Sequence, residues 1–405
     1  STDLSQPTNK SNQTGARAWV GVVVIRVTTL YASGAGVSAA YYTGYLTKAD
    51  GELPGVWAGS QAPGLGLSGE VTTEALEALL SGYHPTTAMS LGRELVDRVD
   101  KHGHTIKAVA GFDATLSAPK SLSVLWGLTG DDAFAQCHDA AVAATVAMIE
   151  KYASTTRIRS NGGRLHPETG GLSMAVFRQS TSRADDPQLH THVVISAKVQ
   201  TADGRWLALD ALTLKKYQQA FGYLYQSVLR AEVTARFGVV FAPIVKGQAE
   251  IVGVPTELLG QFSKRSEEIE VAMDAKLADF FAREGRDPSG SEYAAMEREA
   301  AVDTRSKKSG VAVSDLRTRW QRRRHAHCCD RRRRPATSGR GGTARRVGGG
   351  GVVGVEAVDV ESDGCVAHDL RHGHPATRTR RNQLGERTRR SHRHRARLVY
   401  RPRPG

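Results

Sequence analysis

Cysteine and long apolar runs are both scarce in this chain. Only four of its 405 residues are cysteine. Cys137 stands alone and the other three follow Trp320, so their spacing indicates no disulfide framework and fits a reducing compartment. The apolar run from Trp19 to Ile25 is too short to span a bilayer and is more typical of a strand. Because we find neither a signal peptide nor a transmembrane segment, we expect a cytoplasmic protein without membrane insertion.

The sequence also lacks a loop of the Gly-x-x-x-x-Gly-Lys-Ser/Thr type. Such a loop cradles nucleotide phosphates with its backbone N–H groups, and its lysine reaches the terminal phosphates. We therefore expect neither ATPase nor helicase activity, and no helicase domain.

An excess of positive charge is missing from most of the chain. The formal net charge is +14, but residues 1–318 hold 32 basic and 34 acidic residues. The excess lies in residues 319–405, which contain 23 arginines, no lysine and seven acidic residues. Any DNA-binding surface on residues 1–318 must therefore be a local patch, because net charge does not supply it.

Residues 319–405 predict an Arg/Gly-rich, low-complexity tail, since neither helical nor strand periodicity persists after Trp320. One interpretation is an arginine-rich tail that binds nucleic acid. The other is a GC-rich coding sequence read out of frame, and the absence of lysine favours it. In either case we expect this segment to lack a packed fold.

The preceding residues predict an α+β domain over 19–318, after a polar, disordered lead-in at 1–18. Alternating apolar residues predict strands, and apolar residues three and four apart predict helices. We expect a central antiparallel sheet with helices packed on one side, an open face, and a helical C-terminal extension that closes over a bound strand like fingers. Strands are expected near 20–29, 155–160, 173–179, 189–199 and 205–210, and residues 105–126 should form a strand and a second apolar element. Helices are expected near 73–81, 131–152 and 213–236. The helical extension is expected at about 255–318.

Two histidines on one of these strands are the clearest sign of chemistry. His190 and His192 alternate with Leu189, Thr191 and Val193, so the two imidazoles share one face and the other residues share the opposite face. Paired imidazoles are a common part of metal sites. By itself this spacing is weak evidence, because a histidine pair on a strand is more often a half-exposed polar face.

A third polar residue is expected beside the pair. If strands 173–179 and 189–199 are antiparallel neighbours, Gln179 faces the same pocket as His190 and His192. At this point the sequence resembles the MobF (TrwC-like) class of conjugative relaxases, in the HUH endonuclease superfamily. The matching stretches are Tyr41-Tyr42, Gly59–Glu70, Gly111–Ser121, Arg164–Glu168, Ser182-Arg183, Pro187–His192, Asp203–Trp206, Thr304-Arg305 and Lys308.

The resemblance implies a site- and strand-specific DNA nickase and strand transferase. In such enzymes a tyrosine attacks a phosphodiester at an origin of transfer, stays bound to the 5′-phosphate and leaves a free 3′-OH. A divalent ion held by a histidine cluster polarises the phosphate. The expected partner is single-stranded or hairpin DNA, and conjugation accessory and coupling proteins are further expected partners.

By position, the resemblance implies catalytic roles for Tyr41, Tyr42 and Asp113. Tyr41 matches the leading nucleophile, and Asp113 matches an aspartate that assists deprotonation of the tyrosine or orients a metal-bound imidazole. Family members often carry a second tyrosine pair, whereas this chain offers only Tyr45 nearby. A tyrosine pair in a helix is otherwise usually core packing.

The ligand set departs from the family at one position. The resemblance implies metal binding by His190, His192 and Gln179, where Gln179 replaces a histidine of the best-known members. An amide oxygen should weaken binding of borderline ions and shift the preference toward Mg²⁺ or Mn²⁺, with Zn²⁺ or Ni²⁺ binding in vitro.

Four basic residues are candidate DNA contacts: Lys120, Arg178, Arg183 and Arg205. Each could equally be a solvated surface charge, and phosphate contacts carry no sequence information. Two other functions stay open at this stage. The protein could be a metal-dependent phosphodiesterase that uses water, or a non-catalytic relaxase remnant that binds single-stranded DNA, the latter suggested by Gln179 and the unusual C-terminal residues.

Overall fold

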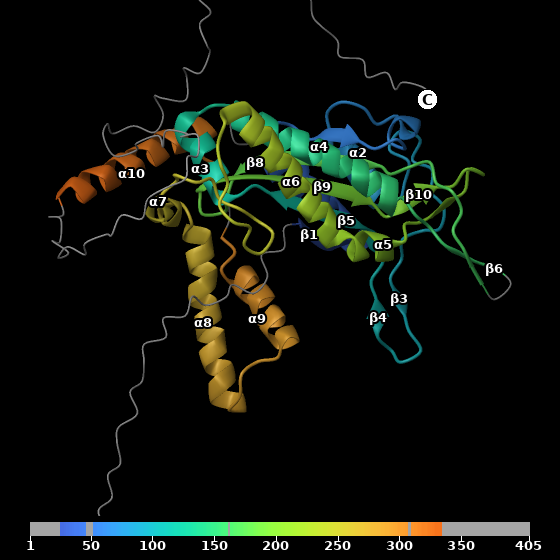
Figure 1. Cartoon of the computed structure of the whole chain (residues 1–405). Coiled ribbons are helices and arrows are strands. Elements are labelled where there is room, and N and C mark those ends of the chain that lie inside the picture. Colours follow the sequence, from blue (N-terminus) through green and yellow to red (C-terminus); the bar gives the residue numbers. More distant parts are fainter. Residues whose placement is uncertain (1–24, 46–51, 161–162, 307–308, 334–405) are drawn as a thin grey trace, which may run out of the picture. The chain divides into compact units, whose positions relative to one another are not determined.

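A computed structural model describes residues 25–45, 52–160, 163–306 and 309–333 (Figure 1). The chain divides into two units, Ser1–Ala367 and His368–Gly405, and every described residue belongs to the first. The predicted lead-in at 1–18 and the part of the tail after Arg333 lie outside the described residues.

The centre of the fold is a five-stranded antiparallel sheet in the order β1-β5-β9-β8-β2. The fold class predicted from the sequence is thus confirmed. The strands are β1 (Ile25–Tyr31), β2 (Val56–Ala58), β5 (Val109–Ser117), β8 (Met174–Thr181) and β9 (Pro187–Ser196). Three two-stranded ladders accompany this sheet: β3 (Arg98–Val99) with β4 (Thr105–Ile106), β6 (Ile158–Ser160) with β7 (Gly163–Leu165), and β10 (Lys198–Gln200) with β11 (Trp206–Ala208).

One face of the central sheet is apolar and is covered by a layer of helices. This layer consists of α3 (Lys120–Thr129), α4 (Ala133–Ala153) and α6 (Gln218–Phe237), which is preceded by α5 (Ala211–Lys216) (Figure 1). Strand alternation directs Leu116, Leu189 and Val193 into this layer, where all three are fully buried or nearly so. These residues form part of the largest hydrophobic core cluster. Because Leu189 and Val193 point into it, His190 and His192 must lie on the opposite face of β9.

The second face of the sheet is covered only in part. The short helices α1 (Ala35–Ala40) and α2 (Thr73–Leu80) pack on it through a separate buried cluster that includes Ala39, Leu76 and Phe177. The backbone continues from α1 into a π-helical turn, Tyr41–Tyr45. Such turns are rare and are frequently found at functional sites. This turn carries Tyr41 and Tyr42, which pack at the cluster on this second face of the sheet.

The C-terminal part of the described chain is helical, with α7 (Thr256–Gln261), α8 (Lys264–Glu284), α9 (Gly290–Asp303) and α10 (Val313–Arg333). The boundary predicted at residue 319 falls inside α10. The expectation that regular structure ends after Trp320 is therefore wrong. Trp320 is fully buried next to Trp126, and arginine is a good helix former, so the helix continues into the arginine-rich segment.

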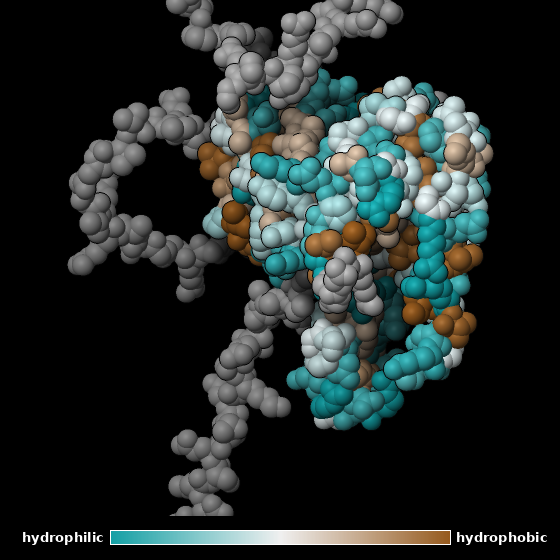
Figure 2. All heavy atoms as spheres, turned by 90° about the vertical axis from the view of Figure 1, so that its right-hand side faces the viewer, coloured by the Kyte–Doolittle hydropathy of each residue, from teal (hydrophilic) through white to brown (hydrophobic). Residues whose placement is uncertain are grey.

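Hydrophobic side chains are scattered over the face of the molecule seen in Figure 2. Figure 2 shows small, separate hydrophobic patches within a mostly hydrophilic face.

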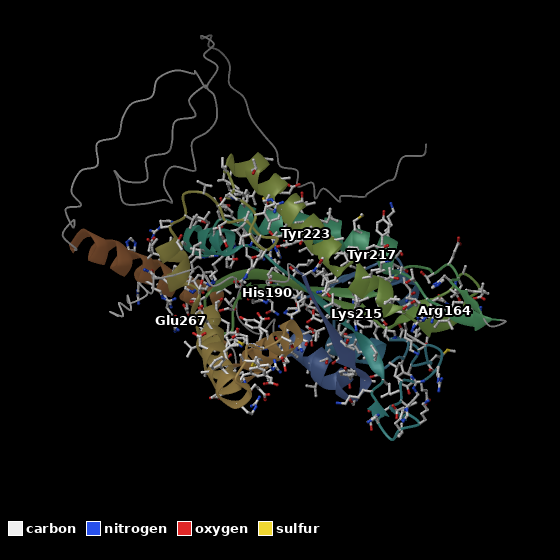
Figure 3. All side chains as sticks on the ribbon, turned by 60° about the horizontal axis from the view of Figure 1, so that its bottom comes forward. Arg164, His190, Lys215, Tyr217, Tyr223 and Glu267 are labelled. Atoms are coloured by element: carbon white, nitrogen blue, oxygen red, sulfur yellow. The ribbon has the colours of Figure 1, made fainter. Side chains whose placement is uncertain are left out.

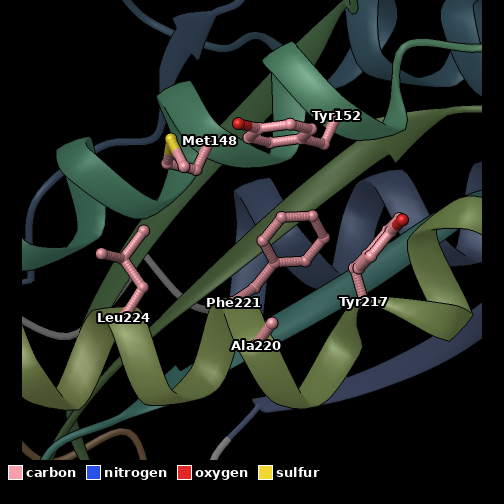
Figure 4. A pocket seen from close by; sticks show the side chains of 6 residues that line it. All are labelled: Met148, Tyr152, Tyr217, Ala220, Phe221 and Leu224. Carbon is pink, nitrogen blue, oxygen red and sulfur yellow. The ribbon is translucent and has the colours of Figure 1, made fainter.

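A pocket of about 230 Å³ opens between α4 and α6 (Figure 4). It is lined by Met148, Tyr152, Tyr217, Ala220, Phe221 and Leu224. Among the described residues, no helix has the length and apolar character needed to cross a bilayer.

Candidate active site

The strand register places the predicted ligands on one face of the sheet. His190 lies opposite Gln179 of β8 and Ser117 of β5, and His192 lies opposite Thr115. The centroids of the two imidazoles are 5.3 Å apart. His190, labelled in Figure 3, and His192 thus project from the face opposite the large helix layer, as the alternation of β9 predicts.

Hydrogen bonds orient both imidazoles in the same way. The Nδ1 atom of His192 lies 2.8 and 3.0 Å from the two carboxylate oxygens of Asp113, and Nδ1 of His190 lies 2.9 Å from the backbone carbonyl oxygen of Gln188. Because both partners accept, each Nδ1 carries the proton, and in the neutral rings each Nε2 carries a lone pair. Histidine ligands of metal ions are typically oriented by such bonds to a carboxylate or carbonyl.

The donor set fits a divalent cation with one amide among its ligands. The side chain of Gln179 is buried and lies directly across from His190. Within the described residues, no group of three or more His, Cys, Asp or Glu side chains is placed to hold a metal ion. The strand register therefore brings two imidazoles and the Gln179 amide to one face of the sheet, with the hydroxyls of Ser117 and Thr115 beside them.

The two neighbouring tyrosines have different environments. Tyr42 is buried, stacks on Phe177 and donates a hydrogen bond of 2.8 Å from its hydroxyl to Asp113 Oδ2. Burial and the adjacent Asp113 carboxylate raise the pKa of Tyr42 far above its ordinary value. This phenol is consequently held in its protonated form and oriented inward.

Tyr41 is half-buried, and its hydroxyl accepts a hydrogen bond of 2.9 Å from Arg183 Nη2. The Arg183 guanidinium carbon also lies 5.7 Å from the centroid of the Tyr41 ring. The Tyr41 hydroxyl thus contacts a cation, whereas the Tyr42 hydroxyl contacts a carboxylate.

Arg183 is itself fixed by the chain on both sides. It lies in the turn between β8 and β9, where Ser182 and Asp186 are joined by a backbone hydrogen bond and Asp185 has a φ of 57°. The Arg183 Nη1 atom donates to the carbonyl oxygen of Ser306 (3.1 Å), and the Ser306 hydroxyl donates to the backbone carbonyl oxygen of Arg183 (3.2 Å). The segment after α9 thus holds the arginine that contacts Tyr41.

The other three predicted DNA contacts do not join this cluster. Arg178 lies on the helix-covered face and forms an ion pair with Asp139 of α4 (2.6 Å). Arg205 pairs with Asp203 beside the short β10–β11 ladder. Lys120 at the start of α3 donates to the backbone carbonyl of Pro187 (3.0 Å), and burial lowers its pKa to about 8.

Some functional neighbours were not predicted from the sequence. Phe177 forms the apolar platform under Tyr42, and Ser306 anchors Arg183. The position of Phe177 two residues before Gln179 on the same strand was the available signal, because it places both on one face. Ser306 had no signal of its own beyond following the Thr304-Arg305 pair.

Comparison with known proteins identifies the family of this chain. A family model described as TrwC relaxase matches residues 27–327. Two curated relatives from Escherichia coli, one from strain K12, are both described as multifunctional conjugation protein TraI. They are 39% identical over 259 residues (60% of this chain, 14% of TraI) and 35% identical over 302 residues (71% and 15%). This chain therefore spans about 15% of the length of these relatives.

Solved structures of the conjugative relaxase TrwC in complex with OriT DNA share the fold. The metal-free complex matches with a TM-score of 0.61 and 30% identity, covering 75% of this chain and 99% of the TrwC chain. The metal-bound complex matches with a TM-score of 0.61 and 30% identity, covering 74% and 96%. The fold is that of a conjugative relaxase of the MobF class. The chain belongs to the TrwC relaxase family.

Proposed function

We propose that this protein nicks one DNA strand at an origin of transfer and transfers that strand through a covalent 5′-phosphotyrosine. The Tyr41 oxygen attacks the phosphorus, and the bond from phosphorus to the 3′ oxygen breaks. The phenol proton passes to water, and the 3′ oxygen takes up a proton and leaves as a hydroxyl. Because the phosphotyrosine conserves the phosphodiester, the strand can later be rejoined.

The observation that carries this proposal is the contact between Arg183 and Tyr41 on the face of the sheet that bears the histidine pair. Tyrosine, with an ordinary pKa of about 10, is a weak nucleophile at neutral pH without help. The Arg183 guanidinium supplies a positive charge at the phenol oxygen. The same cation stabilises negative charge on a phosphate bound beside Tyr41.

Tyr42 and Asp113 act in this proposal by positioning rather than by attack. The Asp113 carboxylate accepts from both Tyr42 and His192, so it fixes the imidazole and the second tyrosine together. This arrangement supports the orienting role of Asp113 more than a role as the base for Tyr41. The raised pKa of Tyr42 likewise makes it a poor nucleophile.

His190, His192 and Gln179 would hold the divalent cation. Such an ion stabilises the charge that develops on the non-bridging phosphate oxygens. The amide oxygen of Gln179 favours Mg²⁺ or Mn²⁺ over the softer ions that a third imidazole would attract. Both histidines already present Nε2 in the tautomer that binds metals.

The substrate proposed for this site is single-stranded or hairpin DNA of an origin of transfer. TrwC structures were solved in complex with OriT DNA in metal-free, metal-bound and copper-bound forms. We further propose that the reaction takes place in the cytoplasm, with conjugation accessory and coupling proteins as partners. Residues 19–318 would form the nicking domain.

A denaturing gel tests the chemistry directly. The protein is incubated with Mn²⁺ and an origin oligonucleotide labelled on the 3′ side of the nick, and a labelled band at the mass of a protein–DNA adduct is expected. Tyr41→Phe should abolish this band, whereas Tyr42→Phe should retain it. Cleavage without any adduct would indicate a phosphodiesterase that uses water, and binding without cleavage would indicate a non-catalytic remnant.

A further inference from the structure

The strand that carries the histidine pair has a buried polar side chain on its other face. Thr191 lies between His190 and His192 and points into the helix layer, where it is only 1% exposed. The residues that flank it on that face of β9, Leu189 and Val193, are apolar. A hydroxyl in such surroundings needs a hydrogen-bond partner, because burying it unpaired is unfavourable.

His138 of α4 is that partner. Its Nε2 lies 2.7 Å from Thr191 Oγ1, and its Nδ1 lies 2.6 Å from the hydroxyl of Tyr225 on α6. All three side chains are almost completely buried. Burial lowers the pKa of His138 to about 3, so the ring is neutral at pH 7 and has one donor and one acceptor for the two hydroxyls.

A charged pair lies beside this chain of hydrogen bonds. Arg178 is the register partner of Thr191 on β8, and it pairs with Asp139, the residue after His138. The polar residues of β8, β9 and α4 therefore meet directly behind the histidine pair. The remaining contacts of α4 and α6 with this face of β9 are mainly hydrophobic.

We propose that His138 is a positioning residue for the metal site, and that its hydrogen bond to Thr191 fixes the segment of β9 from which His190 and His192 project. Apolar contacts are non-directional and leave a strand some freedom to shift, whereas a fully paired buried hydrogen-bond network is directional. Metal ligands must be held to within about 0.5 Å of their working geometry. This inference rests on the proposed function only in taking the two histidines as ligands.

The test compares two variants, each of which removes one of the two hydroxyl groups that hydrogen-bond to His138. Thr191→Val keeps the shape of the side chain and cuts the link to β9, whereas Tyr225→Phe cuts the link to α6 and leaves the Thr191 bond intact. Mn²⁺ affinity is measured by titration calorimetry on the DNA-free protein, and stability by urea unfolding. Because each variant leaves one imidazole nitrogen buried without its hydroxyl, we expect comparable losses of stability.

The metal affinities should differ. We expect Thr191→Val to weaken Mn²⁺ binding about tenfold, Tyr225→Phe to change it by less than about twofold, and Thr191→Ser, which restores a hydroxyl, to recover most of the affinity. Equal weakening by the Val and Phe variants would show that His138 only stabilises the core, and unchanged affinity in Thr191→Val would also overturn the proposal. A wild-type protein that binds no Mn²⁺ would instead refute the metal site of the proposed function.

Discussion

Replacement of Trp320 by alanine tests whether α10 is an integral part of the relaxase fold. The indole is fully buried, with its centroid 6.3 Å from that of Trp126 on α3. Its Nε1 donates to the carbonyl oxygen of Asp185 (2.8 Å), in the turn that carries Arg183. In the same helix, Arg323 pairs with the buried Asp186. The Trp320 side chain therefore joins α10 both to the core and to the β8–β9 turn.

The loss of stability can be worked out from these contacts. A tryptophan buries about 200 Å² of surface, which at about 25 cal/mol per Å² corresponds to about 5 kcal/mol. Substitutions of buried tryptophan by alanine typically destabilise by about 3–5 kcal/mol, since the surroundings relax in part. The lost hydrogen bond adds about 1 kcal/mol, within the spread of these values. We therefore expect the free energy of unfolding to fall by about 4 kcal/mol.

Urea unfolding followed by circular dichroism measures this change. Arg319→Ala is the matched control, because Arg319 is the adjacent residue of α10 and is exposed. The control should alter the free energy of unfolding by less than about 0.5 kcal/mol. A loss below about 1 kcal/mol in Trp320→Ala would refute the reasoning and would mean that α10 contributes little to the fold.

Three further predictions concern individual side chains. Gln179→His should raise affinity for Zn²⁺ by about tenfold or more, measured by titration calorimetry, because it supplies a third imidazole; unchanged Zn²⁺ affinity would exclude Gln179 as a ligand. Asp113→Asn should weaken Mn²⁺ binding about 10- to 100-fold while Asp203→Asn, beside the β10–β11 ladder, should not, and equal effects would contradict the orienting role of Asp113. The depressed pKa of Lys120, about 8, means that the unfolded chain binds its proton more tightly. This group should therefore make the protein more stable as pH rises from about 8 towards 10.5, and Lys120→Met should lack that rise in urea titrations at several pH values.

The sheet and the orientation of its histidines could be predicted from the sequence. Alternation along β9 has a period of two, so Leu189 and Val193 had to enter the core if His190 and His192 were to face away from it. The place of Gln179 followed from antiparallel pairing of β8 with β9, and the structure bears it out. These inferences succeeded because they depend on local geometry and on one strand pairing.

Features that depend on packing between distant segments could not be predicted. Nothing in the dipeptide Tyr41-Tyr42 indicates that one hydroxyl meets Asp113 and the other meets Arg183, since both contacts span many residues of chain. Arg178 is next to Gln179 on β8, so alternation already placed it on the face opposite the histidines, but its ion pair with Asp139 depends on the packing of α4.

The central claim is that the Tyr41 phenol is the attacking group. Mass spectrometry of the adduct formed with an origin oligonucleotide tests it most directly, because trypsin releases Tyr41 and Tyr42 in one peptide, Val27–Lys48, whose fragment ions locate the nucleotide. We predict a 5′-phosphonucleotide on Tyr41 and an unmodified Tyr42. An adduct on Tyr42, or cleavage that leaves this peptide unmodified, would contradict the account.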